Sequence, residues 1–135
     1  MAKLSEIMVD VKAQEEGQRL PHPIFNGVDV LVRGDQCEKA RKRRALLQNR
    51  LPQKRRKTGD ALLAHEEIER LVTAEMCGGW WGIEGEDGKP IEYTEERCRE
   101  WAALPEYRRF FEGIRELAAE IGNAETEVHE ESLRD

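Results

Sequence analysis

Residues Gly78–Thr94 read GGWWGIEGEDGKPIEYT, and this stretch decides how the rest of the chain is organised. It concentrates glycine and aromatic residues in a sequence otherwise dominated by charged helix formers. Glycines and a proline surround its acidic centre, which predicts a tight turn because glycine reaches positive φ and proline fixes φ at about −65°. Ile83 before the turn and Ile91 after it are typical of short β arms. We therefore expect a small hairpin between helical segments.

Two tryptophans, Trp80 and Trp81, are adjacent in this stretch. Because neighbouring residues of a strand point to opposite faces, we expect one indole in the core and the other exposed. Together with Tyr93 and Trp101, these aromatics form either the core of a small domain, which is the more common arrangement, or the lining of a ligand pocket. An exposed tryptophan is a common anchor for a protein partner.

Apolar residues repeat at helical spacing in four segments of the remaining sequence. We expect helices over residues 36–51, 61–77, 95–104 and 105–121, with the Gly/Trp hairpin between the second and the third. Proline or glycine follows each of them, and such residues commonly end helices. The first helix would end at Pro52 and the second at Gly78-Gly79.

The N-terminal third has a β pattern. In residues 7–12, Ile7, Val9 and Val11 alternate with Met8, Asp10 and Lys12, which favours a half-buried strand. Val28–Arg33 alternates in the same way. Asn26-Gly27 just before the second run is a turn signal, so we expect the two strands to pair.

These patterns predict one domain that is mainly α with a small β component. An N-terminal β-hairpin-like unit of residues 1–34 precedes a helical body of residues 35–122 that holds the four short amphipathic helices. Residues 123–135 have no periodicity and many acids, which predicts a disordered tail.

Charge is distributed unevenly along the 135 residues, whose net charge is −6. Residues 36–57 hold ten Lys and Arg and only Glu38 as an acid, whereas residues 58–135 hold 21 acids and eight bases. The apolar runs are too short for a transmembrane helix, and the first residues lack the layout of a signal peptide. Together with widely spaced cysteines, this predicts free thiols in a reducing cytoplasm.

No pattern in the sequence favours catalysis. Three cysteines and three histidines show none of the spacings of metal sites, so we expect no metal and no cofactor. Convergence of His65, Cys77 and Cys98 in space is the one alternative for a metal. Both of those thiols fall on apolar helix faces, where thiols are inert. We expect a protein that is not an enzyme.

The basic segment is the strongest indication of a nucleic-acid partner. Lysines and arginines of residues 39–57 could neutralise phosphates, which dominate nucleic-acid affinity. No aromatic residue lies between them and no nucleic-acid motif surrounds them, so a protein partner, or the acidic half of another copy, accounts for them equally well. The candidate basic patch comprises Arg41, Arg43, Arg44, Lys54, Arg55 and Arg56.

The order of these pieces resembles the tail assembly chaperones of long-tailed bacteriophages and prophages. The resemblance covers most of residues 25–120 and is better after Gly78. The basic run 54–57 and the second tryptophan depart from the family pattern. The matching residues are the G-W-x-G-(I/L)-like element Gly79–Ile83, the turn Glu86–Ile91, the capped start Tyr93–Thr94, and Pro105, Tyr107 and Phe110 of the last helix.

This resemblance implies a non-catalytic protein of the host cytoplasm that is missing from the mature virion. Such chaperones bind the tape measure protein, help to recruit tail tube protein and tend to self-associate, so it also implies a homo-oligomer. We expect the tape measure protein to contact Trp80, Trp81, Phe110 and Phe111. The alternatives are a small nucleic-acid-associated protein acting through residues 39–57, and a structural tail or head-completion protein.

Overall fold

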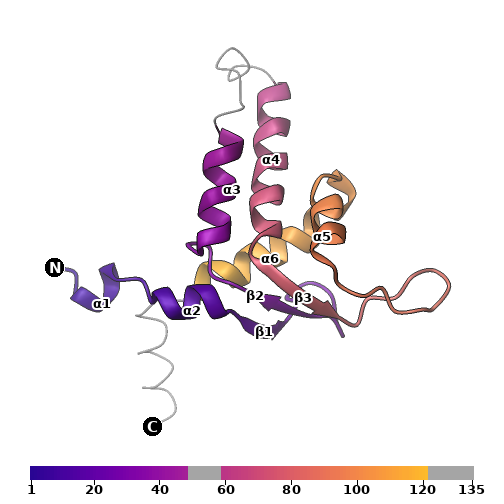
Figure 1. The fold of residues 1–135 in the computed structure, drawn as a ribbon, viewed down its shortest axis with the longest axis horizontal. Helices are drawn as coiled ribbons and strands as arrows, with labels where there is room; N and C mark the ends of the chain where they lie inside the picture. The colour runs from indigo at the N-terminus through magenta and orange to yellow at the C-terminus, as the bar shows by residue number, and fades with distance from the viewer. Residues whose placement is uncertain (49–58, 122–135) are drawn as a thin grey trace, which may run out of the picture.

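The computed structural model describes residues 1–48 and 59–121 (Figure 1). In this part of the chain, helices gather on one face of a three-stranded antiparallel sheet. The predicted fold class, mainly α with a small β component, is confirmed. The expected helix end at Pro52, the basic residues Lys54, Arg55 and Arg56, and the acidic tail of residues 123–135 lie outside the described residues.

The sheet has the order β1-β2-β3, with β2 in the centre. Its strands are β1 (Gln18–Pro21), β2 (Asp29–Val32) and β3 (Cys77–Trp81). The turn between β1 and β2 contains Gly27 at φ 82°, so the predicted Asn26-Gly27 turn is confirmed. Val30 and Val32 on the central strand are fully buried and face the helices.

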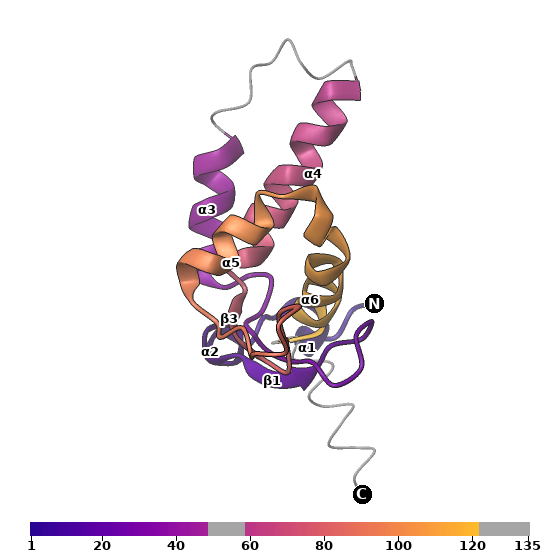
Figure 2. The same ribbon diagram turned by 90° about the vertical axis from the view of Figure 1, so that its right-hand side faces the viewer.

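The helices form an upright pair and a layer that crosses the sheet (Figures 1 and 2). α3 and α4 are the upright pair, and α6 lies across the sheet and contacts β2. Ile114 and Ala118 of α6 are fully buried there. The helices are α1 (Leu4–Ile7), α2 (Val11–Glu16), α3 (Glu38–Gln48), α4 (Gly59–Ala74), α5 (Glu95–Ala102), the 3-10 turn η2 (Pro105–Tyr107) and α6 (Arg108–Glu120).

The expected strand over Ile7–Val11 is wrong. Those residues belong to α1, a short connection and the start of α2. The Asp10 carboxylate accepts a hydrogen bond from the amide of Ala13 at 3.1 Å and caps α2, a local preference that outweighs the alternating pattern. The partner of β2 is instead β1, which ends in Pro21 at the sheet edge, where a proline costs no internal ladder bond.

The predicted second helix is too long at its C-terminal end. α4 ends at Ala74, and the glycines expected to stop it lie inside β3. β3 pairs with β2 in the register Val30↔Trp80 and Leu31↔Gly79, so burial of Trp80 against the helices favours a strand over a further helical turn. Sheet pairing between distant segments has overridden the local helical pattern.

The predicted turn after Trp81 is confirmed. The amide of Gly85 donates to the carbonyl of Lys89 at 2.8 Å, and the amide of Ile91 donates to the carbonyl of Ile83 at 2.8 Å. Thr94 then caps α5, as expected, by accepting from the amide of Arg97 at 3.0 Å. The hairpin therefore leads from the sheet edge into the last two helices.

Gln14 joins the N-terminal helix α2 to the body of the protein. Its amide nitrogen donates to the carbonyl of Ile121 at 2.7 Å, and its side-chain oxygen accepts from the amide of Gln36 at 2.8 Å. Gln14 is 3% exposed, so its buried polar groups form these hydrogen bonds within the protein in place of bonds to water. Gln14 is therefore a buried tie from α2 to the end of α6 and to the segment before α3.

Candidate functional site

Three of the four expected partner contacts are core residues. Trp80, Phe110 and Phe111 are 3%, 6% and 1% exposed. The Trp80 indole stacks on Trp101 with 4.6 Å between ring centroids, and Phe110 meets Trp80 edge-on at 5.8 Å. The Trp80 Nε1–H donates to the carbonyl of Ile91 at 2.8 Å, which satisfies its one polar group. The role of these aromatics is therefore to join the sheet, the hairpin and α6.

Trp81 is the expected contact that lies exposed. It is 41% exposed and occupies the face of the sheet opposite to the helices, as the alternation along β3 predicts. Its indole lies over Gly79: a Cβ at that glycine would come within 3.2 Å of the ring carbon Cη2. Leu31 is the register partner of Gly79 and extends this surface onto the central strand.

Arg19 completes the surface around Trp81. Its guanidinium carbon lies 3.9 Å from the centroid of the Trp81 ring, a cation–π contact. Asp29 on the neighbouring strand holds the guanidinium through Oδ2 at 3.2 Å. We call Arg19, Leu31, Gly79 and Trp81 the outer sheet surface. The Trp81 indole is thus contacted by the Arg19 guanidinium and lies against Gly79.

The described part of the basic patch lies on α3, beside two lysines that form ion pairs within the chain. Arg41 is exposed, and Arg43 and Arg44 are half-buried. Beside them, Lys42 pairs with Glu38 at 2.8 Å and Lys39 pairs with Glu95 of α5 at 3.5 Å. The hydrogen bond from Lys42 lowers the pKa of Glu38. Some of the basic charge is thus satisfied by the acidic half of the same chain.

The cysteines are buried free thiols. The hydrogen bond with Cys77 and burial both raise the pKa of Cys98, and burial raises the pKa of Cys37. Cys98 is therefore held as a neutral thiol beside Cys77. Within residues 1–48 and 59–121, no three His, Cys, Asp or Glu residues gather as a metal site would require, and His65 is exposed on α4.

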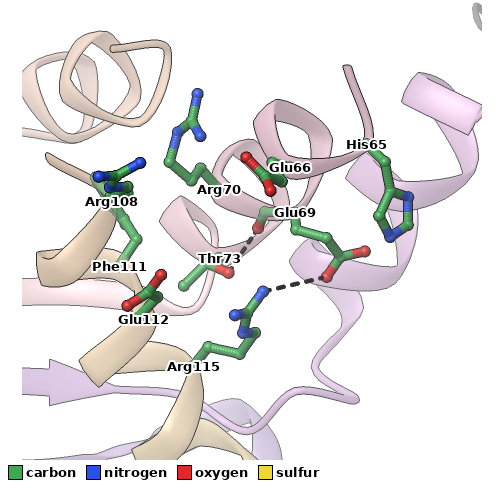
Figure 3. A pocket seen from close by; sticks show the side chains of 9 residues that line it. All are labelled: His65, Glu66, Glu69, Arg70, Thr73, Arg108, Phe111, Glu112 and Arg115. Atoms are coloured by element: carbon green, nitrogen blue, oxygen red, sulfur yellow. Dashed lines mark hydrogen bonds and ion pairs between the residues drawn. The ribbon is translucent and has the colours of Figure 1, made fainter. Parts of the chain in front are cut away.

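A charged pocket of about 300 Å³ lies between α4 and α6 (Figure 3). Glu69 and Arg115 approach to 3.9 Å across it, and the Thr73 hydroxyl donates to the carbonyl of Glu69 at 2.6 Å. Arginines and glutamates alternate around the pocket, so no single sign of charge prevails. The sequence analysis missed this pocket because its residues come from two helices, distant in sequence, that meet only in the fold.

An apolar groove of about 670 Å³ lies at the hairpin end of the molecule. Its apolar lining comes from the β1–β2 turn, the hairpin, α5, η2 and α6. The acidic residues Glu84, Glu86 and Glu106 also line it, with one basic residue, Arg109. The sequence analysis missed the groove because five separate segments build it. The apolar residues are Phe25, Val28, Ile83, Ile91, Trp101, Tyr107 and Phe110.

Comparison with known proteins places the chain in a family. The model of a family described as "YdaY prophage protein" matches residues 35–134, which is well over half of the chain. The chain therefore belongs to the YdaY prophage protein family, so it is a phage or prophage protein. Neither the curated proteins nor the solved structures contain a match to it. Within residues 1–48 and 59–121, no helix has both the length and the apolar character needed to span a bilayer.

Proposed function

We propose that this prophage protein is a tail assembly chaperone that binds the tape measure protein through the outer sheet surface. One observation carries the proposal: Trp81, at the variable position of the Gly79–Ile83 element, is exposed and contacts both Gly79 and the Arg19 guanidinium. Ordered, exposed tryptophans are frequent hot spots of protein interfaces. An apolar stripe of the tape measure helix would lie over Trp81 and Leu31.

Several properties of the chain support a binding role without catalysis. Its thiols are buried, and neither the charged pocket nor the apolar groove is lined by residues of the outer sheet surface. In this proposal the protein acts in the host cytoplasm, recruits tail tube protein during assembly and leaves before the virion is complete. In this proposal Trp81 is the one partner contact among the four expected residues, because Trp80, Phe110 and Phe111 are buried in the core.

Co-expression with the tape measure protein of the same prophage tests the proposal. We expect the wild-type chain to keep the tape measure protein soluble and to co-purify with it. Trp81→Ala should reduce the recovered complex by roughly tenfold or more, as expected for a hot-spot residue. Leu46→Ala is the matched control, since Leu46 is 47% exposed on α3, away from the sheet. An unchanged solubility of the tape measure protein with the wild-type chain would refute the function.

A nucleic-acid-associated protein is the second candidate, favoured by the exposed Arg41 and the half-buried Arg43 and Arg44 on α3. Binding of DNA or RNA through these residues must weaken steeply with salt. Binding that is unaffected by replacing these arginines with alanine excludes this candidate. A structural tail or head-completion protein is separated from a chaperone by mass spectrometry of purified particles, in which a chaperone is missing.

A further inference from the structure

The walls of the apolar groove are held in place by contacts with the rest of the fold. The Trp101 indole is stacked between the rings of Trp80 and Tyr107, at 4.6 Å between centroids on each side. Gly82, at the start of the hairpin, lies so close to the β1–β2 turn that a Cβ there would collide with the carbonyl oxygen of Gly27. A site that is formed before its ligand arrives loses little conformational entropy on binding.

Apolar surface remains accessible inside this groove. Phe110 is 6% exposed, whereas Phe25 is 38% exposed and the other apolar lining residues are partly buried. Within residues 1–48 and 59–121, the Tyr107 hydroxyl and the Trp101 Nε1–H have no hydrogen-bond partner. A peptide segment offers what such a lining binds, because it combines apolar side chains with backbone carbonyl groups.

The groove has an acidic rim. Glu84 and Glu86 of the hairpin and Glu106 of η2 are exposed, and none of their carboxylates forms an ion pair with another described residue. Among the described residues, Arg109 is the one basic residue that lines the groove. The two other charged residues of the hairpin tip are of opposite sign. The rim therefore carries an excess of negative charge, which attracts a basic partner.

The chain's own C-terminal segment does not complement this rim. Residues 122–135 hold five acids and one arginine, so their net charge has the same sign as that of the rim. Like charges that face each other across an interface disfavour binding. The groove therefore favours a basic apolar segment of a different protein.

We propose that the apolar groove docks a segment of another protein in which apolar side chains are flanked by Lys or Arg. Its apolar side chains lie against Phe25 and Tyr107, and its basic side chains reach the three glutamates of the rim. The groove shares no residue with the outer sheet surface, so one copy can hold two different partners at once. This inference does not rest on the chaperone function proposed above.

NMR titration of the isotope-labelled protein with a short amphipathic peptide of leucine and lysine tests the proposal. Each of the three tryptophans gives its own indole N–H signal, so Trp101 reports on the groove and Trp81 on the outer sheet surface. We expect the peptide to shift the Trp101 signal and to leave that of Trp81 in place. An analogue with glutamine in place of lysine should bind about fivefold more weakly, and one with glutamate more weakly still. Added salt should weaken binding of the lysine peptide.

Reversal of the rim charge gives a matched pair of variants. Glu84→Lys with Glu106→Lys should weaken binding of the lysine peptide by about tenfold or more and strengthen binding of the glutamate analogue. Glu66→Lys with Glu112→Lys makes the same change of net charge at exposed residues of the charged pocket. This control should keep its affinity for the lysine peptide within about twofold of the wild type, because neither residue lines the groove.

Several outcomes would overturn the proposal. They are a shift of Trp81 in place of Trp101, equal affinity for the three peptides, no binding of the lysine peptide, or an equal effect of the two double variants. Self-association of the free protein that Glu84→Lys with Glu106→Lys abolishes would assign the groove to a second copy instead. Glutamine replaces lysine at both positions if the variant loses the dispersed signals of a folded protein. No tape measure protein is present, so failure here leaves the chaperone proposal to its own experiment.

Discussion

The imidazole Nε2 of His22 lies 2.9 Å from the carbonyl oxygen of Phe110. On the other side of the ring, Nδ1 accepts from the amides of Ile24 and Phe25 at 3.1 and 3.4 Å. Nδ1 therefore carries no proton, and Nε2–H is the donor to Phe110. One buried side chain thus links the β1–β2 turn to the first turn of α6, and both of these line the apolar groove.

Replacing His22 with alanine should destabilise the protein by about 2–4 kcal/mol, because it leaves buried polar groups unpaired and opens a cavity. Urea denaturation measures this loss. His65→Ala is the control, since His65 is exposed and should change stability by no more than about 0.5 kcal/mol. An equal effect of both substitutions would show that His22 makes no special contribution.

Gly113→Ala should also destabilise the fold, although alanine favours a helix by about 1 kcal/mol over glycine. A Cβ at Gly113 would collide with the His22 ring, and overpacking of this kind costs about 1–3 kcal/mol. In the double variant with His22→Ala the collision is gone, so the two losses should sum to more than the measured total. Strict additivity in this double-mutant cycle would exclude direct contact as the cause.

Substitution of Trp80 should mainly lower stability, whereas substitution of Trp81 should mainly weaken binding. Trp80→Ala removes the centre of the aromatic cluster and should cost about 3–5 kcal/mol of unfolding free energy. Trp81→Ala removes a half-exposed side chain and should cost about 1 kcal/mol or less, while it weakens binding of the tape measure protein. Thermal unfolding and co-purification measure the two effects. Equal destabilisation by both substitutions would reduce Trp81 to a structural residue.

Tyr93 should make the protein sensitive to alkali. Burial, assisted by the neighbouring Cys77 and Cys98 thiols, raises the pKa of Tyr93 above its ordinary value of 10. The unfolded chain therefore loses this proton first, so the stabilisation is complete below about pH 10 and is lost as pH rises above it. Unfolding free energies measured from pH 8 to pH 11.5 should fall less steeply for Tyr93→Phe.

The same substitution has a second expected effect at neutral pH. The Tyr93 hydroxyl donates to the carbonyl of Cys77 at 3.1 Å, and its loss should cost about 1 kcal/mol. Tyr107→Phe is the control, because it leaves Tyr93 and its partner in place. The buried thiols contribute to the alkaline loss in every variant, so the comparison isolates Tyr93. Identical alkaline slopes for wild type and Tyr93→Phe would contradict the assignment.

Local patterns predicted the helices better than the strands. The stripes of α5 and α6 were predicted correctly because each helix has its own apolar face. Thr94 caps α5, and Pro105 begins the 3-10 turn that leads into α6. The strand expected over Ile7–Val11 failed because the Asp10 cap decides that segment locally. The start of β3 and its partner were missed because Gly78 and Gly79 are typical of a helix end. The strand is stabilised by pairing with β2, more than forty residues away.

The candidate site was predictable only in part. Alternation along a strand indicated that one of Trp80 and Trp81 would be buried and the other exposed. Which of the two is exposed depends on the side of the sheet that α6 covers, and no pattern around residue 80 contains that information. The apolar groove needed the placement of five segments at once. Ion pairs such as Lys39–Glu95 could not be predicted either, because they join helices that are distant in the sequence.

The three buried thiols can report when the segments around them open. Cys37 precedes α3, Cys77 lies in β3 and Cys98 lies in α5, and each is 1% exposed or less. A thiol so placed reacts with a labelling reagent only when its own segment opens. Single-cysteine variants would therefore time the opening of the upright helix, the sheet edge and the hairpin end separately, and show which of them yields when a partner binds.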